Sequence, residues 1–277
     1  MIMLDACLGV GGPAIMKKAK SDYLIQSVSR ALDILEAFAI GQEELGVTEL
    51  SRKLKLHKNN VFRLLATLET RGYVEQDRET GNYRLGMKTF EVASVFLHHL
   101  GVAKQARPVL EQLAGETGET AYLAVLDGPW VVCVDMVETG HAVRVVSQLG
   151  RRLPAHAAAL GKAQLACRSH EELEQLWKQH ELTAVTPRSI TDPGRLGEEL
   201  TQVAAQELAF EDEELASGVR GVAAPVRDYQ KRVVGAIGVT GPVLRLTLER
   251  LQSELGPRVK AAAHSVSKRL GYAVIPG

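Results

Sequence analysis

Three short helical patterns joined by tight turns constrain the fold of this chain more than any other feature. They cover Ser27–Ile40, Glu49–Leu54 and Asn59–Arg71, and only Lys55–Lys58 separates the second from the third. Three short helices with so tight a turn before the last are typical of a helix-turn-helix. Many proteins carry the same trihelical unit purely to bind other proteins, so the pattern alone leaves both functions open.

Polar residues and glycines mark the ends of these helices. Ser27 or Ser29 is expected to cap the first helix and Thr48 the second, whereas Gly41 and Gly72 end the first and the third. The residues expected on the buried faces are Val28, Ala31, Leu32, Ile34, Leu35 and Phe38 in the first helix, and Val61, Leu64, Leu65 and Leu68 in the third.

A β-hairpin follows the third helix directly. Tyr73–Leu85 alternates between apolar and polar residues around a turn at Glu79–Asn82. A hairpin in this position is a wing, and its Arg78 and Arg84 are expected to lie along a phosphate backbone. Met87–Val102 is again helical and bridges to the second domain, with the boundary near residues 100–104.

The charge distribution supports nucleic-acid binding, although the total charge does not. Lysine plus arginine equals aspartate plus glutamate, 33 against 33. The segment from Leu50 to Leu68, however, holds five basic residues and no acid, which predicts a phosphate-binding face or, more simply, a solvated helix face. Asparagine suits adenine and arginine suits guanine or phosphate. The candidate DNA-contacting residues are Arg30, Thr48, His57, Lys58, Asn59, Asn60, Arg63, Arg78 and Arg84.

Composition and cysteine usage exclude several other classes. A length of 277 residues suits two unequal domains, and 45% hydrophobic with 24% charged residues is typical of a folded soluble protein. Cys7, Cys133 and Cys167 show no CxxC pair and no zinc spacing, so we expect no disulfide, metal or cofactor and a cytoplasmic location. No apolar run approaches the ~18 residues of a membrane span. Residues 1–22 are expected to form a disordered extension.

The second part of the chain mixes helices and strands, which predicts an α+β fold with a sheet between helices. The expected helices are Lys104–Thr117 (interrupted early at Pro108), Ala159–Cys167, Glu171–Gln179, Pro193–Glu207 and Leu246–Leu270. The expected strands are Thr120–Leu126, Val131–Val137, Ala142–Leu149, Val219–Arg227 and Val233–Thr240. An Asp127-Gly128-Pro129 turn joins the first two strands into an antiparallel hairpin.

Six stretches of sequence make the chain similar to the IclR family of bacterial transcription regulators. SVSRALDILEAF, TELSRKLKLHKNNVFRLLATLETRGYVEQD and GNYRLG resemble that family's DNA-binding domain. LPAHAAALGKA (Leu153–Ala163), GVRGVAAPVRD (Gly218–Asp228) and GAIGVTGP (Gly235–Pro242) resemble its effector domain in the same order. The resemblance covers roughly residues 25–275.

This resemblance implies a winged helix-turn-helix (residues 23–86), a linker helix (87–103) and a GAF-like mixed α/β effector-binding domain (104–277). It implies a homodimer or homotetramer that binds a roughly palindromic double-stranded operator, because one short helix reads too few base pairs for specificity. It also implies that a small-molecule effector, an organic acid, shifts the population of two arrangements through the linker helix. No membrane partner is expected.

The family pattern assigns the effector site residue by residue. The loop entering the ALGKA helix forms part of the pocket wall, and free amides at a helix start suit a carboxylate. The resemblance places an acidic residue ten positions before a usual cysteine, and two small hydroxyl positions on a later strand. The candidate effector-binding residues are Ala159, Leu160, Gly161, Glu211, Asp212, Gly221, Gly238 and Thr240.

Two of these positions depart from the family pattern. Gly221 replaces the cysteine and Gly238 replaces a serine, which removes two polar contacts and predicts more room. We therefore expect a bulkier effector than the smallest oxo-acids. Two alternatives stay open: a DNA-binding regulator that has lost its sensor, and an enzyme with its site in the second domain. Against the enzyme, the sequence has no nucleophile elbow, no paired carboxylates with a separate base and no metal spacing. His156 is the residue to test if it is one.

Overall fold

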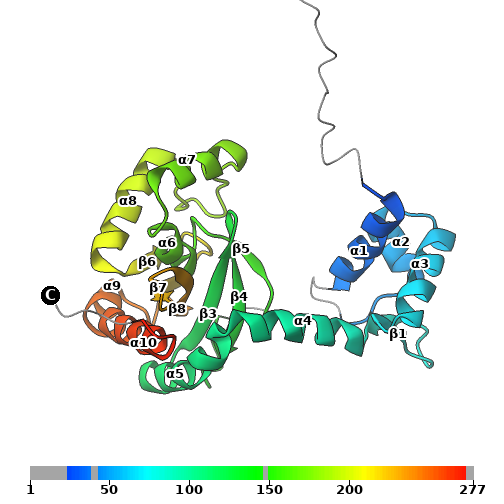
Figure 1. Cartoon of the computed structure of the whole chain (residues 1–277), viewed down its shortest axis with the longest axis horizontal. Coiled ribbons are helices and arrows are strands. Elements are labelled where there is room, and N and C mark those ends of the chain that lie inside the picture. The colour runs from blue at the N-terminus through cyan, green and yellow to red at the C-terminus, as the bar shows by residue number, and fades with distance from the viewer. Residues whose placement is uncertain (1–23, 39–42, 146–148, 273–277) are drawn as a thin grey trace, which may run out of the picture. The chain divides into compact units, whose positions relative to one another are not determined.

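Three helices and a two-stranded hairpin form the first of the two units into which the chain divides, Met1–Ala93 and Ser94–Gly277 (Figure 1). The structure, a computed structural model, describes residues 24–38, 43–145 and 149–272. The helices are α1 (Gln26–Phe38), α2 (Val47–Leu54) and α3 (Lys58–Thr70), and the hairpin pairs β1 (Val74–Gln76) with β2 (Tyr83–Leu85). The predicted helix-turn-helix and wing are confirmed. The predicted extension lies outside the described residues.

The core of the first unit gathers one face of each helix. Ile34, Leu50, Val61 and Leu65 are all fully buried, as is Leu45, which pairs with Tyr83 of the wing. The stripe predicted for α3 is confirmed, since Val61, Leu65 and Leu68 are buried and Leu64 packs against them.

The stripe predicted for α1 is wrong at two positions. Val28 and Leu32 are 53% and 52% exposed, whereas Ile34, Ala37 and Phe38 face the core. The core contacts only one side of this helix, so a run of apolar residues wider than that side leaves some of them in solvent.

Two of the predicted helix starts are also wrong. Gly46 is the N-cap of α2 and makes no side-chain cap bond, so Thr48 lies inside the helix with its side chain exposed. Ser27 likewise lies inside α1, whose first turn is closed by the carbonyl of Ile25. The predicted stop at Gly72 is confirmed, because this residue has φ +75° directly after the C-cap of α3. The stop at Gly41 lies outside the described residues.

The bridging helix is shorter than predicted and the next one is longer. Helix α4 (Met87–Leu100) ends before Gly101, whose φ of +56° breaks the helical path, and α5 (Val102–Thr117) begins immediately after it. Pro108 lies inside α5 and does not interrupt it. Proline removes one helical hydrogen bond, but burial of Val109, Leu110 and Leu113 along the same helix holds its path.

A six-stranded sheet organises the second unit. Its strands are β3 (Thr120–Asp127), β4 (Trp130–Val137), β5 (Arg152–Pro154), β6 (Ala209–Asp212), β7 (Val219–Arg227) and β8 (Val233–Pro242). They lie in the order β5-β4-β3-β8-β7-β6, and all neighbours are antiparallel. The predicted β3–β4 and β7–β8 pairs are confirmed. The strand predicted at Ala142–Leu149 is wrong for residues 142–145, and the third strand of that region is β5 instead.

Helices cover both faces of this sheet (Figure 1). Helix α5 and α10 (Gly256–Arg269) pack on one face with Leu123, Val226 and Ile237 of the strands. The other face is covered by α6 (Ala159–Leu165), with α7 (His170–Gln179) and α8 (Pro193–Gln206) beyond it. The predicted closing helix is divided into α9 (Leu248–Arg250), a π-helical segment (Leu251–Leu255) and α10. Strand β6 was not predicted. The α+β prediction is confirmed, and no helix of the described residues is long and apolar enough to span a membrane.

Candidate functional site

The exposed side of α3 presents polar and basic side chains without internal partners. Lys58, Asn59, Asn60 and Arg63 are all exposed, opposite the buried stripe of the same helix. His57 is the N-cap residue and makes no side-chain cap bond. Within the described residues, none of these side chains takes part in a hydrogen bond or ion pair. The first amides of α3 and these side chains therefore present free donors and positive charge to solvent, the arrangement in which a helix can bind phosphate and base edges.

The remaining basic residues of the helix-turn-helix differ in what they do. Lys53 Nζ donates to the Ala37 carbonyl at 3.0 Å, so this lysine ties α2 to the end of α1. Lys55 forms the turn itself, in a left-handed conformation with φ 53°. Arg52 and Lys55 are exposed beside α3, and Arg30 is half-buried on α1. Arg52 and Lys55, two of the five basic residues in the Leu50–Leu68 segment, therefore remain available to a phosphate backbone, although they were not among the candidate DNA-contacting residues.

The two wing arginines are in different states. Arg84 Nε donates to Glu75 Oε1 at 2.6 Å across the hairpin, which raises the pKa of the arginine. Arg78 is exposed at the turn and has no partner among the described residues. Asp77 Oδ1 accepts from the amides of Glu79 and Thr80, each at 2.8 Å, and these bonds lower the pKa of the carboxyl. Asp77 thus fixes the turn that presents Arg78.

A cavity of about 270 Å³ lies in the second unit, between the sheet and the segment that enters α6. Its walls come from all six strands and from the start of α6. Apolar side chains dominate, and the lining residues with polar side chains are Tyr122, Cys133, Arg151, Arg152, Glu211 and Thr240. Of the predicted effector residues, Ala159, Leu160, Glu211 and Thr240 line it.

Glu211 is the unusual group of this cavity. Its side chain is 3% exposed, Oε2 accepts from the Ala159 amide at 3.4 Å, and Oε1 has no hydrogen-bond partner among the described residues. Burial, together with the nearby charge of Glu214, raises the pKa of this carboxyl to about 7, although the amides of Ala159 and Leu215 and the charge of Lys162 act in the opposite direction. One of the amides predicted to receive a ligand carboxylate, that of Ala159, is therefore already bonded to the protein's own glutamate.

The other four predicted effector residues do not line the cavity. Asp212 points away from it and pairs with Arg220 (2.5 Å) and Arg188. Gly161 is needed for packing, because a Cβ there would lie 2.2 Å from the Ala155 carbonyl oxygen. Because the backbone of α6 lies so close to the loop that enters it, only glycine fits at position 161.

The two glycines that depart from the family pattern behave differently from each other. A Cβ at Gly221 would lie 3.2 Å from Thr240 Oγ1 and 3.6 Å from Glu211 Oε2, so this position borders the polar end of the cavity. A Cβ at Gly238 would lie 2.5 Å from the Val222 carbonyl oxygen. The expectation that Gly238 leaves room for a ligand is therefore wrong: the neighbouring strand β7 fills that space.

A buried cluster of charged side chains joins α6 to α8 and to the segment after β6, and it was not predicted. Lys162 is fully buried, and its Nζ donates to both carboxylate oxygens of Glu214, at 2.7 and 2.9 Å, and to Glu199. Two carboxylates therefore compensate this ammonium. His156, also buried, bonds through Nε2 to the Thr183 carbonyl at 3.1 Å, and burial lowers its pKa. The geometry gives both residues structural roles.

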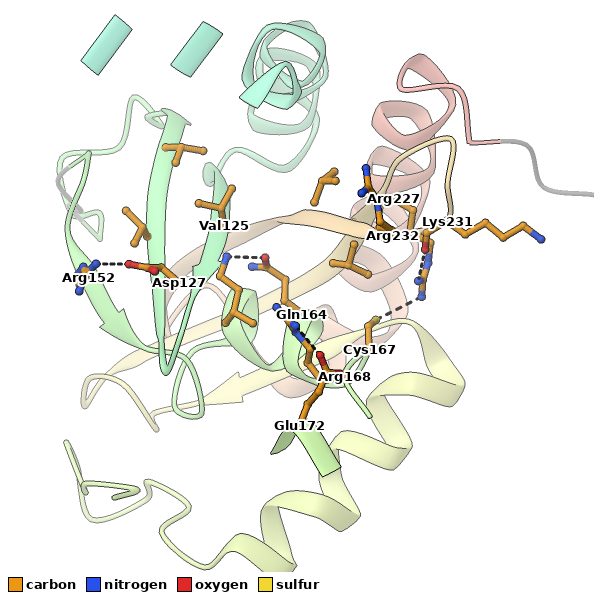
Figure 2. A pocket seen from close by; sticks show the side chains of 15 residues that line it. Val125, Asp127, Arg152, Gln164, Cys167, Arg168, Glu172, Arg227, Lys231 and Arg232 are labelled. Carbon is orange, nitrogen blue, oxygen red and sulfur yellow. Dashed lines mark hydrogen bonds and ion pairs between the residues drawn. The ribbon is translucent and has the colours of Figure 1, made fainter. Parts of the chain in front are cut away.

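A larger open cleft of about 940 Å³ lies where the sheet splits (Figure 2). Pairing of β3 with β8 ends at Ala124. Beyond that point the amide of Leu126 donates to Gln164 Oε1 at 2.9 Å instead of pairing with β8. The cleft is rich in arginine, but Figure 2 shows these cations already engaged: Arg152 with Asp127 and Arg168 with Glu172. Paired, exposed charges make this cleft a weaker candidate for a small-molecule site than the Glu211 cavity.

A winged helix-turn-helix with an uncompensated basic face, followed by an α+β unit that encloses a cavity, defines a DNA-binding transcription regulator. Residues 27–78 match the model of the IclR helix-turn-helix domain, and residues 94–268 match that of the bacterial transcriptional regulator IclR C-terminal domain. The chain belongs to the IclR family.

Individual relatives agree with this assignment. The chain is 35% identical over 249 residues to the HTH-type transcriptional regulator XynR of Escherichia coli (strain K12). The matched region covers 90% of this chain and 98% of XynR. The chain is 34% identical over 249 residues to the transcriptional repressor IclR of the same organism, covering 89% and 90%. The solved structure of an IclR homologue from Microbacterium hydrocarbonoxydans, complexed with 4-hydroxybenzoate, has the same fold. It is 24% identical with a TM-score of 0.77, covering 88% of this chain and 99% of that one.

Proposed function

We propose that this protein is a sequence-specific regulator whose operator binding is controlled by an organic acid in the Glu211 cavity. The free polar face of α3 carries the DNA-binding part of this proposal. Lys58, Asn59 and Asn60 are the candidate contacts at the start of the helix, and Arg63 lies one turn further along it. Arg30, Thr48, His57, Arg78 and Arg84 remain candidate contacts around it.

Replacing Arg63 by alanine tests this face. If Arg63 contacts a base, the change weakens binding to an operator selected from a random DNA pool by about 1–3 kcal/mol. Arg195→Ala removes the same charge from an exposed position on α8, and operator affinity should stay unchanged. Fluorescence anisotropy at several salt concentrations measures both. Equal affinity of the two variants would disprove the assignment of Arg63, and absence of any salt-sensitive binding would disprove DNA binding itself.

We also propose that two copies of the chain bind a palindromic operator together. One α3 helix contacts few base pairs, and two-fold symmetry doubles the number read. Three exposed apolar residues support self-association, because they form one stripe at helical spacing: Ile25, just before α1, and Val28 and Leu32 on α1. Sedimentation with and without operator distinguishes monomer, dimer and tetramer.

The size of the cavity supports an effector larger than a two-carbon acid. About 270 Å³ is near the lower limit of typical small-molecule sites (~300 Å³), and a water occupies ~30 Å³. The ligand of the Microbacterium homologue, 4-hydroxybenzoate, is of suitable size and chemistry. We propose a monocarboxylate with an apolar body that packs against Leu160, Leu215 and Val222.

Calorimetry tests the sensor with a panel running from acetate and glyoxylate to benzoate and 4-hydroxybenzoate. The proposal expects the larger acids to bind and to change operator affinity, since a ligand shifts an equilibrium only through its differential affinity for the two states. Binding of glyoxylate-sized acids alone would refute the size argument. Absence of binding by every acid, together with intact operator binding, would favour a regulator that has lost its sensor.

A further inference from the structure

The Glu211 cavity offers an incoming carboxylate very few free polar partners. Tyr122 donates its hydroxyl to the Val145 carbonyl at 3.0 Å, and Arg152 is paired with Asp127. Within the described residues, the cavity side chains that have no partner are Arg151, Thr240 and the Oε1 atom of Glu211. Arg151 is exposed, and exposed ion pairs contribute only ~0–1 kcal/mol. The buried orphan atom is therefore the group that gains most from a ligand.

Among the described residues, no free buried cation is available to neutralise an anion at Glu211. Lys162, the buried ammonium nearby, is already compensated by Glu214 and Glu199. A ligand carboxylate beside an ionised Glu211 would bring two like charges together in a desolvated space. Two adjacent carboxyl groups resolve this by sharing one proton, as a charge-assisted hydrogen bond.

We propose that Glu211 binds the effector's carboxylate as a neutral carboxylic acid, so that each effector anion enters the cavity together with one proton. This inference rests on the proposed function, namely that an organic acid occupies the cavity. Oε1–H donates to the ligand, and Oε2 keeps its bond from Ala159. Because the protonated Glu211 donates a hydrogen bond, the cavity should prefer ligands that present a hydrogen-bond acceptor at this end.

The surrounding charges leave Glu211 as the group that titrates near neutral pH. Burial already raises the pKa of Glu211 to about 7, and burial raises those of Tyr122 and Cys133 to about 12, which keeps both neutral. The remaining ionisable groups that face Glu211 or its partners are Lys162 and His156 on and before α6, Glu199 on α8, Glu214 after β6, and Arg151 and Arg152 beside β5.

The sign of the pH dependence follows from this geometry. Above about pH 7 the empty cavity holds an ionised Glu211, so binding must take up a proton, and affinity should fall roughly tenfold per pH unit. Below that pH the proton is already present, and affinity should level off.

Glu211→Gln separates the proton from the shape of the site. Glutamine keeps a donor at the same place and has no titration, so affinity for 4-hydroxybenzoate and benzoate should match that of the acid form of the wild type and not vary between pH 6 and 9. Glu198→Gln removes a charge from an exposed position of α8 and should keep the wild-type pH profile. Calorimetry in buffers of different ionisation enthalpy should show uptake of about one proton per site at pH 8 in the wild type and none in Glu211→Gln.

The other outcomes are equally clear. Binding without proton uptake would overturn this inference alone and would place the carboxylate at Arg151. Affinity that rises with pH would also overturn it, because it would mean that an ionised Glu211 accepts from a donor on the ligand. Absence of binding at every pH would overturn the proposed sensor and this inference with it.

Discussion

Replacing Lys162 by methionine is expected to lower the free energy of unfolding of the second unit by about 3–5 kcal/mol. The ammonium is fully buried and bonds to Glu214 and Glu199. Methionine fills most of the same volume but leaves a nearly buried Glu214 carboxylate without its cation, and such an uncompensated charge is costly. Urea denaturation of the full chain, followed by circular dichroism, measures the change.

Two further variants show whether the loss comes from the charge. Lys178→Met breaks an exposed pair with Glu174 (3.4 Å) in α7 and should cost no more than ~0.5 kcal/mol. The double variant Lys162→Met/Glu214→Gln removes both partners and should recover part of the loss. Equal stabilities of Lys162→Met and Lys178→Met would contradict the proposed role of the cluster.

Gly161→Ala is expected to destabilise the second unit by about 3 kcal/mol, although alanine is a better helix former than glycine. An added Cβ would lie 2.2, 2.4 and 2.6 Å from three backbone atoms of Ala155, so α6 must move away from the segment that enters it. Because Ala159 and Leu160 begin the same helix and line the cavity, effector affinity should fall as well.

Gly197 in α8 provides a matched comparison. It also lies inside a helix, but a Cβ there would meet nothing within 4 Å. Gly197→Ala should therefore stabilise the protein by up to ~1 kcal/mol through helix propensity alone. Thermal unfolding of both variants should move in opposite directions. A stabilising Gly161→Ala would show that the helix and the loop are less closely packed than described.

The spacing of apolar residues and the positions of glycines and turns were sufficient to predict the helices and the hairpin of the first unit. Val61, Leu65 and Leu68 follow helical spacing, Gly72 ends the helix, and Tyr73–Leu85 alternates around a turn, so each element could be predicted from neighbouring residues. The errors occurred where the sequence offered several equivalent choices. Serine and threonine near a helix start do not show which of them caps it, and apolar residues on α1 do not show which of them the core covers.

The second unit was harder because several of its decisive contacts are distant in sequence. The short strands β5 and β6 were missed, and both are defined by pairing with β4 and β7 rather than by their own composition. The family resemblance correctly gathered Ala159, Glu211, Gly221 and Thr240 in one region. It did not show that Glu211 occupies the Ala159 amide or that strand β7 fills the space beside Gly238.

The sequence by itself determined the helix-turn-helix, the wing and the basic face of α3, because these depend on side chains within a few turns of one another. Only the tertiary structure decided which charges of the second unit are buried and what they face. Lys162 and Glu214 are 52 residues apart, as are Ala159 and Glu211. Burial and pKa depend on everything packed around a group, and the sheet assembles those surroundings from strands that no local pattern places side by side.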